Sequence, residues 1–212
     1  MRSNPFIASA ALCLASLPAL AEDAPTLTVN PTPFEYRAEP PPASSQAPAS
    51  SVADFAAADT RWWSVGTGVA FDFEDGTSFN LHASLSYFVA DNIEAVGEVG
   101  AWYYSQPGED AFGVNPAFVL RWHFINKGSW TAFADIGIGM LLASSDVPAD
   151  NGTSFNLTPR VGVGLTYALD DAGTRLQLGL RWAHVSNARI TGHDDNFGVD
   201  AAMPYVGLIF PF

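Results

Sequence analysis

Cysteine is almost absent from this chain of 212 residues, and the only one, Cys13, lies close to the N-terminus. Nearby, Arg2 is followed by a short apolar run that ends in a small-x-small sequence at 19–21. These are the features of a secretory signal peptide, so we expect residues 1–21 to be one. The mature chain would then begin at Glu22 without cysteine, which excludes disulfides and thiol catalysis.

Basic residues are also few. Nine Lys and Arg stand against 22 Asp and Glu, for a formal net charge of −13. Loss of Arg2 with the signal peptide makes the mature chain more acidic still. No basic stripe is present to bind phosphates, which argues against nucleic acid as a partner.

Long hydrophobic runs are missing as well, although 48% of the residues are hydrophobic. After the signal peptide, no segment approaches the ~18 consecutive apolar residues that a membrane helix needs. An exported chain that is rich in apolar residues but lacks such a run favours a β-barrel.

Glycine is absent from residues 22–59, where seven prolines, including the run at 40–42, occur among many Ala and Ser residues. Such a composition cannot bury much apolar surface, so we expect a disordered periplasmic tail. All 18 glycines lie from Gly66 onward. The remaining residues, 60–212, are long enough for one folded domain.

Beyond the tail, apolar side chains recur at every second position, which predicts β-strands. In the first such segment, Trp63 and Val65 share one face, whereas Ser64 and Gly66 share the other. Eight segments repeat this pattern, and the last of them ends at Phe212.

The two faces of these segments differ throughout, since one is apolar and the other is small or polar. A membrane barrel turns its apolar face to lipid and its polar face to the lumen. Eight strands enclose a lumen that side chains can fill. We therefore predict an all-β fold, an eight-stranded antiparallel transmembrane β-barrel, with a soluble lipocalin-like barrel as the alternative. The charged lumen residues would be Glu94, Glu98, Arg121, Arg160 and Arg181, with His82 and His123 as hydrogen-bonded fillers.

The connections between the segments alternate in length. Short turns are expected at 90–92, 126–129 and 170–173. Longer loops are expected at 106–114, 144–153 and 187–199, and only the connection near 75–76 is short where a long one is expected. Short periplasmic turns and long outer loops are typical of barrels in the bacterial outer membrane.

Polar residues interrupt the apolar face of the last hairpin. His184 and Ser186 are two residues apart, so their side chains share a face, and it is the outward one. Counting back from Phe212 in steps of two places Asp200 on the same face. If His184 lies opposite Asp200, the two side chains start ~5 Å apart at Cβ. A Ser–His–carboxylate relay can then form near the extracellular rim.

Each member of this group has a chemical role to fill. His184 would be the general base for Ser186, and Asp200 would orient the imidazole. Asn187, or backbone N–H groups in the turn after it, could stabilise the oxyanion. A plain alternative is that these are polar rim residues without catalytic function, since polar groups near the interface cost only ~0–1 kcal/mol. His193, in the last loop, is expected to be solvated.

The run His184-Val185-Ser186-Asn187-Ala188, followed by 196–200 and a short terminal strand, resembles the lipid A 3-O-deacylase (PagL) family of outer-membrane acyloxyacyl hydrolases. The resemblance implies a serine esterase that removes the ester-linked 3-hydroxyacyl chain at the 3 position of lipid A, with no cofactor and no metal. It implies Ser186 as nucleophile, His184 as base and Asp200 as the acid. Arg189 stands where glycine often follows the motif, and the family's acid is more commonly Glu.

Two other functions are compatible with the sequence. One is a small non-enzymatic barrel with a structural or adhesion role, and the other is an outer-membrane phospholipase. In the preferred interpretation, the partner is lipid A of lipopolysaccharide in the outer leaflet, within the membrane lipid that surrounds the barrel. The sequence leaves open whether a homodimer forms.

Overall fold

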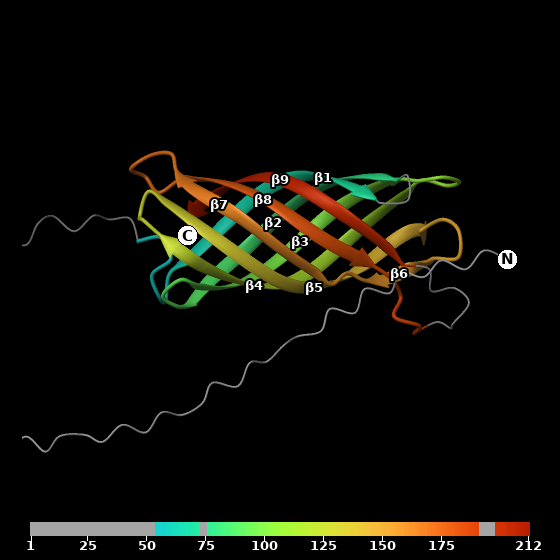
Figure 1. The fold of residues 1–212 in the computed structure, drawn as a ribbon, viewed down its shortest axis with the longest axis horizontal. Coiled ribbons are helices and arrows are strands. Elements are labelled where there is room, and N and C mark those ends of the chain that lie inside the picture. Colours follow the sequence, from blue (N-terminus) through green and yellow to red (C-terminus); the bar gives the residue numbers. More distant parts are fainter. Residues whose placement is uncertain (1–53, 73–75, 191–197) are drawn as a thin grey trace, which may run out of the picture. The chain divides into compact units, whose positions relative to one another are not determined.

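The computed structural model describes residues 54–72, 76–190 and 198–212 (Figure 1). The expected signal peptide, most of the expected tail and His193 lie outside the described residues. Within the part that is described, no helix is long and apolar enough to cross a membrane.

Strands account for most of the described residues, as the two-residue period predicts. In chain order they are β1 (Arg61–Asp72), β2 (Thr77–Ala90), β3 (Ile93–Ser105), β4 (Ala111–Asn126), β5 (Trp130–Val147), β6 (Thr153–Leu157), β7 (Arg160–Ala168), β8 (Arg175–Val185) and β9 (Val199–Pro211).

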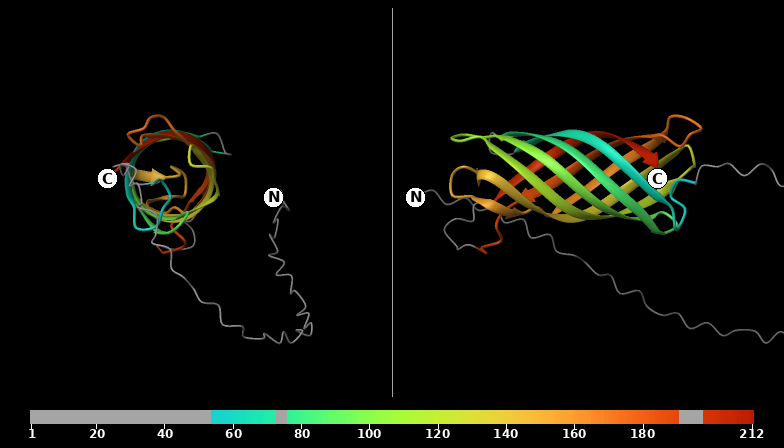
Figure 2. Two further views of the ribbon diagram at one scale, coloured as in Figure 1. Left: turned by 90° about the vertical axis from the view of Figure 1, so that its left-hand side faces the viewer. Right: turned by 180° about the vertical axis from the view of Figure 1, so that it is seen from behind.

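The strands form one closed antiparallel sheet. Strands β1 to β5 pair in chain order, β7 pairs with β5 and β8, and β9 closes the ring by pairing with both β8 and β1. The left view of Figure 2 shows this ring end-on. Both β6 and β7 pair with β5, and only Thr158 and Pro159 separate them. Proline has no N–H for a ladder, so these two segments make one interrupted barrel strand. The predicted eight-stranded antiparallel barrel is confirmed.

Side-chain exposure follows the predicted alternation. Apolar residues such as Leu81 (64% exposed) and Leu180 (52%) cover the outer wall, whereas Arg181 (2%) and Glu94 (2%) point into the lumen. An apolar outer wall around a polar interior is the arrangement of a barrel immersed in lipid. This arrangement is the reverse of a soluble sandwich, in which the apolar side chains face inward.

Ion pairs and hydrogen bonds fill the lumen. Arg121 lies 3.2 Å from Glu94 and 3.2 Å from Asp135. Closer to the outer end, Glu98 accepts from Arg160 at 2.8 Å and from Arg181 at 3.1 Å. The two expected fillers are buried and paired, since His82 contacts Asn80 at 2.7 Å and His123 contacts Thr131 at 2.8 Å through their Nδ1 atoms.

Two strands extend beyond their expected ends. We expected loops at 106–114 and 144–153, but β4 begins at Ala111 and β5 continues to Val147. The side-chain alternation breaks around Asn115 and Pro116, whereas the backbone ladder continues past them to the pair Tyr104↔Ala111. Backbone pairing needs no apolar pattern, which is why the sequence pattern underestimated these strands.

The folded part also begins earlier than the expected boundary at residue 60. The Phe55 ring packs edge-on against Trp62 (5.0 Å between centroids) and against Phe88 (5.4 Å). The Arg175 guanidinium lies 4.2 Å from the same ring. Scattered aromatics in a proline- and alanine-rich segment give no periodic signal, so this packing could not be foreseen.

The two ends of the barrel differ. One carries the short turns 90–93, 126–130 and 168–175 together with Phe212, on the left of Figure 1. The other carries the end of β8 at Val185 and the start of β9 at Val199. Short turns mark the periplasmic end of such barrels, so these ends of β8 and β9 lie at the extracellular end.

Candidate active site

The hairpin of β8 and β9 brings the predicted site residues together. His184 pairs directly with Asp200 across the two strands. Ser186 lies just beyond the end of β8, where it forms a bridge with Leu157. Because strand side chains alternate between faces, His184, Ser186 and Asp200 all project from the outer wall at the extracellular end.

The three side chains form a hydrogen-bonded chain. His184 Nε2 lies 3.0 Å from Ser186 Oγ. On the other side of the ring, His184 Nδ1 lies 2.9 Å from Asp200 Oδ1. With Nδ1 protonated and donating to the carboxylate, Nε2 is left as an acceptor for the serine hydroxyl. That is the arrangement in which an imidazole can remove the hydroxyl proton.

Exposure increases along this chain. Ser186 is only 9% exposed, whereas the side chain of His184 is 31% exposed and that of Asp200 is 47% exposed. The indole of Trp182 lies nearly parallel to the imidazole, with 6.2 Å between the ring centroids. The Ser186 hydroxyl is therefore largely covered by protein, whereas the Asp200 carboxylate is accessible from outside the barrel.

On one edge, this end of β8 is held by backbone hydrogen bonds to the interrupted strand that β6 and β7 form. Ser186 exchanges two bonds with Leu157, which donates at 2.7 Å and accepts at 3.2 Å. The N–H of His184 donates to the Pro159 carbonyl at 3.0 Å. Since β9 pairs with β8 on the other side as far as Val185, the backbone of His184 is held on both edges, whereas the bonds of Ser186 go to Leu157.

A tight turn follows the serine. The N–H of Ile190 donates to the Asn187 carbonyl at 3.0 Å, and the two central residues have positive φ, 52° at Ala188 and 65° at Arg189. Positive φ at both central positions defines a type I′ turn. The Asn187 side-chain oxygen accepts from the Arg189 N–H at 2.7 Å, and Asn187 is 1% exposed. A buried amide thus stabilises a turn that carries no glycine.

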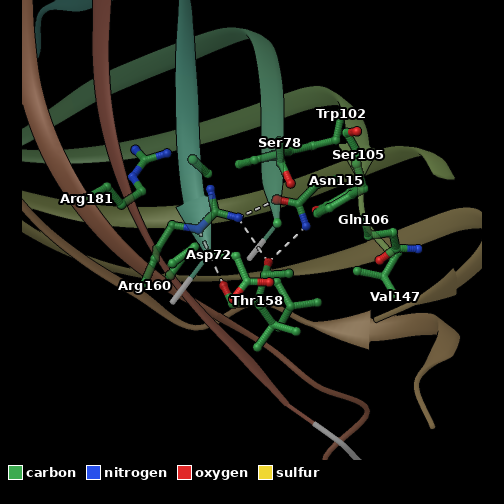
Figure 3. Close-up of a pocket in the computed structure, with 17 residues that line it drawn as sticks. Asp72, Ser78, Trp102, Ser105, Gln106, Asn115, Val147, Thr158, Arg160 and Arg181 are labelled. Carbon is green, nitrogen blue, oxygen red and sulfur yellow. Dashed lines mark hydrogen bonds between the residues drawn. The ribbon is translucent and has the colours of Figure 1, made fainter. Parts of the chain in front are cut away.

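A cavity lies on the other side of the same strands, inside the barrel (Figure 3). Its polar floor contains Arg160, which donates to Asn115 and to Thr158 Oγ1 (3.0 Å). Val185 and Val199, the inward neighbours of the site residues, line its wall. The cavity does not reach the hydroxyl of Ser186, because the wall of the barrel separates them. The hydrogen-bonded side chains therefore lie on the outer face of the barrel, apart from this cavity.

In the ranges 54–72, 76–190 and 198–212, no group of three or more His, Cys, Asp or Glu side chains is placed to hold a metal ion. The groups that do meet on the outer face of this hairpin are one hydroxyl, one imidazole and one carboxylate.

Comparison with known proteins places the chain in a family. The family model for lipid A 3-O-deacylase (PagL) matches residues 56–208. A comparison with curated protein sequences finds no match.

Solved structures of similar fold include Neisserial surface protein A (TM-score 0.57, 15% identity, 72% of this chain and 97% of that one). They also include the outer membrane enzyme PagL (TM-score 0.51, 22% identity, 70% of this chain and 99% of that one). At these identities the structures show the fold, whereas the family model covers nearly the whole barrel. The chain is an outer-membrane β-barrel and belongs to the lipid A 3-O-deacylase (PagL) family.

Proposed function

We propose that this protein is a lipid A deacylase that hydrolyses the ester-linked 3-hydroxyacyl chain at the 3 position of lipid A. The observation that carries the proposal is the hydrogen-bonded chain from Ser186 through His184 to Asp200 on the outer wall. Membership of a family of lipid A 3-O-deacylases supports the choice of substrate.

Acylation of the enzyme is the first half of the proposed reaction. Ser186 Oγ attacks the ester carbonyl while His184 Nε2, 3.0 Å away, takes the hydroxyl proton. Asp200 stabilises the imidazolium that forms and keeps the ring oriented. The tetrahedral intermediate then collapses, the bond from carbon to the sugar oxygen breaks, and His184 returns the proton to that oxygen. The deacylated lipid leaves with a free hydroxyl.

Hydrolysis of the acyl-enzyme completes the cycle. His184 removes a proton from a water molecule, the resulting hydroxide attacks the acyl carbonyl, and the Ser186 oxygen leaves and regains the proton. The products are a free 3-hydroxy fatty acid and the original enzyme, so no oxidant, reductant or cofactor is consumed.

Asn187 is our candidate for oxyanion stabilisation. Its side-chain oxygen accepts from the Arg189 N–H, and the amide nitrogen of the same side chain carries the donors that this role needs. A donor aimed at the developing negative charge typically contributes ~10²–10³-fold in kcat. The backbone N–H of Arg189 and that of Ile190 are both committed within the turn, which makes them weaker candidates.

The position of the site limits what can reach it. The three side chains lie on the lipid-facing wall near the extracellular rim, so a substrate must present its ester at the level of the membrane interface. An amphiphile embedded in the outer leaflet satisfies this condition, whereas a water-soluble ester does so only by leaving solution. This supports lipid A rather than a soluble substrate.

The decisive experiment is mass spectrometry of purified lipid A after incubation with the refolded mature protein. We expect the loss of one 3-hydroxyacyl mass with the wild type and none with Ser186→Ala. Ser154→Ala, a change at an exposed serine of β6 at the same end of the barrel, is the matched control and should retain full activity.

Two outcomes would contradict the proposal. Loss of an acyl chain from glycerophospholipids, but not from lipid A, would assign a phospholipase. No loss from either lipid, with a barrel that is shown to be folded by its heat-modifiable mobility on a gel, would assign a non-enzymatic barrel.

A further inference from the structure

Gly198 occupies the position across from the nucleophile. The pairs His184↔Asp200 and Val185↔Val199 fix the register of the hairpin, and one more step places Gly198 opposite Ser186. By the alternation of the strand, this position projects outward, on the same face as the three site residues. The neighbour of the serine on the lipid-facing wall therefore has no side chain.

The space beside Gly198 is already taken by the imidazole. A Cβ atom added at this glycine would lie 2.6 Å from His184 Cε1 and 2.9 Å from His184 Nε2. It would also lie 3.4 Å from Ser186 Cβ. The first two distances are shorter than van der Waals contact permits, so any other residue here would displace the ring.

Backbone conformation does not account for this glycine. The φ angle of Gly198 lies outside the left-handed region, unlike those of Gly108, Gly128 and Gly173. An L-residue could adopt the same backbone at this position. Glycine is therefore required because a side chain at this position would collide with the His184 ring, and not for its conformational freedom.

Displacement of the His184 ring would have little effect on folding but would disrupt the hydrogen bonds of the relay. The His184 side chain is 31% exposed and can swing outward, away from an added methyl group. Such a movement breaks the bonds to Ser186 and to Asp200 together, because both depend on one ring orientation. A misplacement of about 1 Å at a catalytic group can cost ~10²-fold in rate.

We infer that Gly198 is a positioning residue whose missing side chain makes room for the His184 imidazole between Asp200 and Ser186. This inference rests on the proposed function, because it assumes that the relay performs ester hydrolysis.

Gly198→Ala is the variant that tests the inference, and Gly97→Ala is its matched control. Gly97 also faces outward from a strand, β3, but a Cβ there would meet nothing closer than the Leu85 carbonyl at 3.9 Å. With lipid A as substrate, we expect Gly198→Ala to lower kcat by ~10²-fold with a smaller change in KM. Gly97→Ala should keep the wild-type kcat, and both variants should remain heat-modifiable barrels.

A second measurement reports on the ring itself. In protein labelled with ¹⁵N-histidine and held in detergent micelles, the ring nitrogens of His184, assigned with His184→Gln, report its hydrogen bonding. We expect their chemical shifts to move in Gly198→Ala and to be unchanged in Gly97→Ala. Wild-type shifts together with wild-type kcat in Gly198→Ala would overturn the inference. If the wild type does not deacylate lipid A, the proposed function fails, and the His184 shifts alone decide whether Gly198 positions the ring.

Discussion

A hydroxyl, an imidazole and a carboxylate on a lipid-facing wall are tolerated because of where they lie. Arg or Lys on the lipid face costs ~2–4 kcal/mol at the bilayer midplane, Asp or Glu costs less, and the cost falls to ~0–1 kcal/mol near the interface. His184, Ser186 and Asp200 lie at the extracellular ends of β8 and β9, where that cost is smallest. The same residues placed halfway down the hairpin would destabilise the barrel.

Asp200→Asn tests the role of the acid. The amide can still contact the imidazole, but it cannot stabilise the imidazolium, and it can select the wrong tautomer. We expect kcat on lipid A to fall by ~10²–10⁴-fold, less than for Ser186→Ala. Asp150→Asn, at an exposed rim carboxylate outside the site, is the control and should change nothing. Full activity in Asp200→Asn would remove this residue from the relay.

Asn187→Asp separates the oxyanion role of this side chain from its role in the turn. The variant keeps an oxygen to accept the Arg189 N–H, so the turn should persist, but it loses the amide donors. We expect a loss of at least ~10²-fold in kcat with an unchanged heat-modifiable fold. A wild-type rate in this variant would assign oxyanion stabilisation to backbone N–H groups instead.

At the scale of the element, the register of one hairpin decides whether a site exists. A strand that slips by one residue turns every side chain to the opposite face. The observed register pairs His184 with Asp200 and, further along the hairpin, Leu178 with Val206. The interrupted strand formed by β6 and β7 supports this arrangement from the other edge, through its bonds to Ser186 and His184.

The register can be checked by cross-linking, because the mature chain is expected to contain no other cysteine. Leu178→Cys combined with Val206→Cys places two thiols directly opposite each other on the outer wall, so a disulfide should form on mild oxidation. The control combines Leu178→Cys with Tyr205→Cys, which project to opposite faces, and should not cross-link. Peptide mass mapping distinguishes the two, and the reverse result would show a register shifted by one residue.

On the scale of the whole molecule, buried charges tie distant strands together across the lumen. Glu98 on β3 accepts from Arg160 on β7 and from Arg181 on β8, and the three side chains are nearly inaccessible to solvent. Removing one member of a buried ion pair leaves the others uncompensated, which typically costs ~3–5 kcal/mol.

Glu98→Ala should therefore lower the free energy of unfolding by about 3–5 kcal/mol, since two guanidinium groups lose their carboxylate. Urea titration followed by gel mobility in lipid or detergent measures this change. Glu109→Ala, at an exposed carboxylate in the connection between β3 and β4, should shift the midpoint little. Equal stability of the two variants would mean that the lumen network contributes little to the folded state.

Phe55→Ala tests the closure of the periplasmic end. The ring packs on Trp62 and Phe88 at that end, far from the hairpin that carries the site. Its removal should lower the free energy of unfolding by ~1.5–3 kcal/mol while leaving lipid A deacylation unchanged. The same urea titration and the mass-spectrometric assay report the two quantities, and a large loss of activity would contradict the separation of the two ends.

Much of this molecule could be predicted from one period in the sequence. Alternation of apolar and polar residues identified the strands, their outward faces and the charged lumen, because a membrane barrel imposes a strict two-residue repeat. The same parity is sufficient to place His184, Ser186 and Asp200 on one face of the last hairpin. The family was indicated by the motif at 184–188, because a motif of this kind needs only a few neighbouring residues.

Contacts between segments far apart in the chain needed the tertiary structure, because they have no periodic signature. The packing of Phe55 at the barrel mouth, the choice of Glu98 as the carboxylate for two arginines, and the imidazole seated over Gly198 belong to this class. The sequence by itself determined which way the side chains of the regularly alternating strand segments face, since that follows from counting along a strand. Only the closed barrel decided which side chains meet, because ring closure, register and strand tilt set the distances.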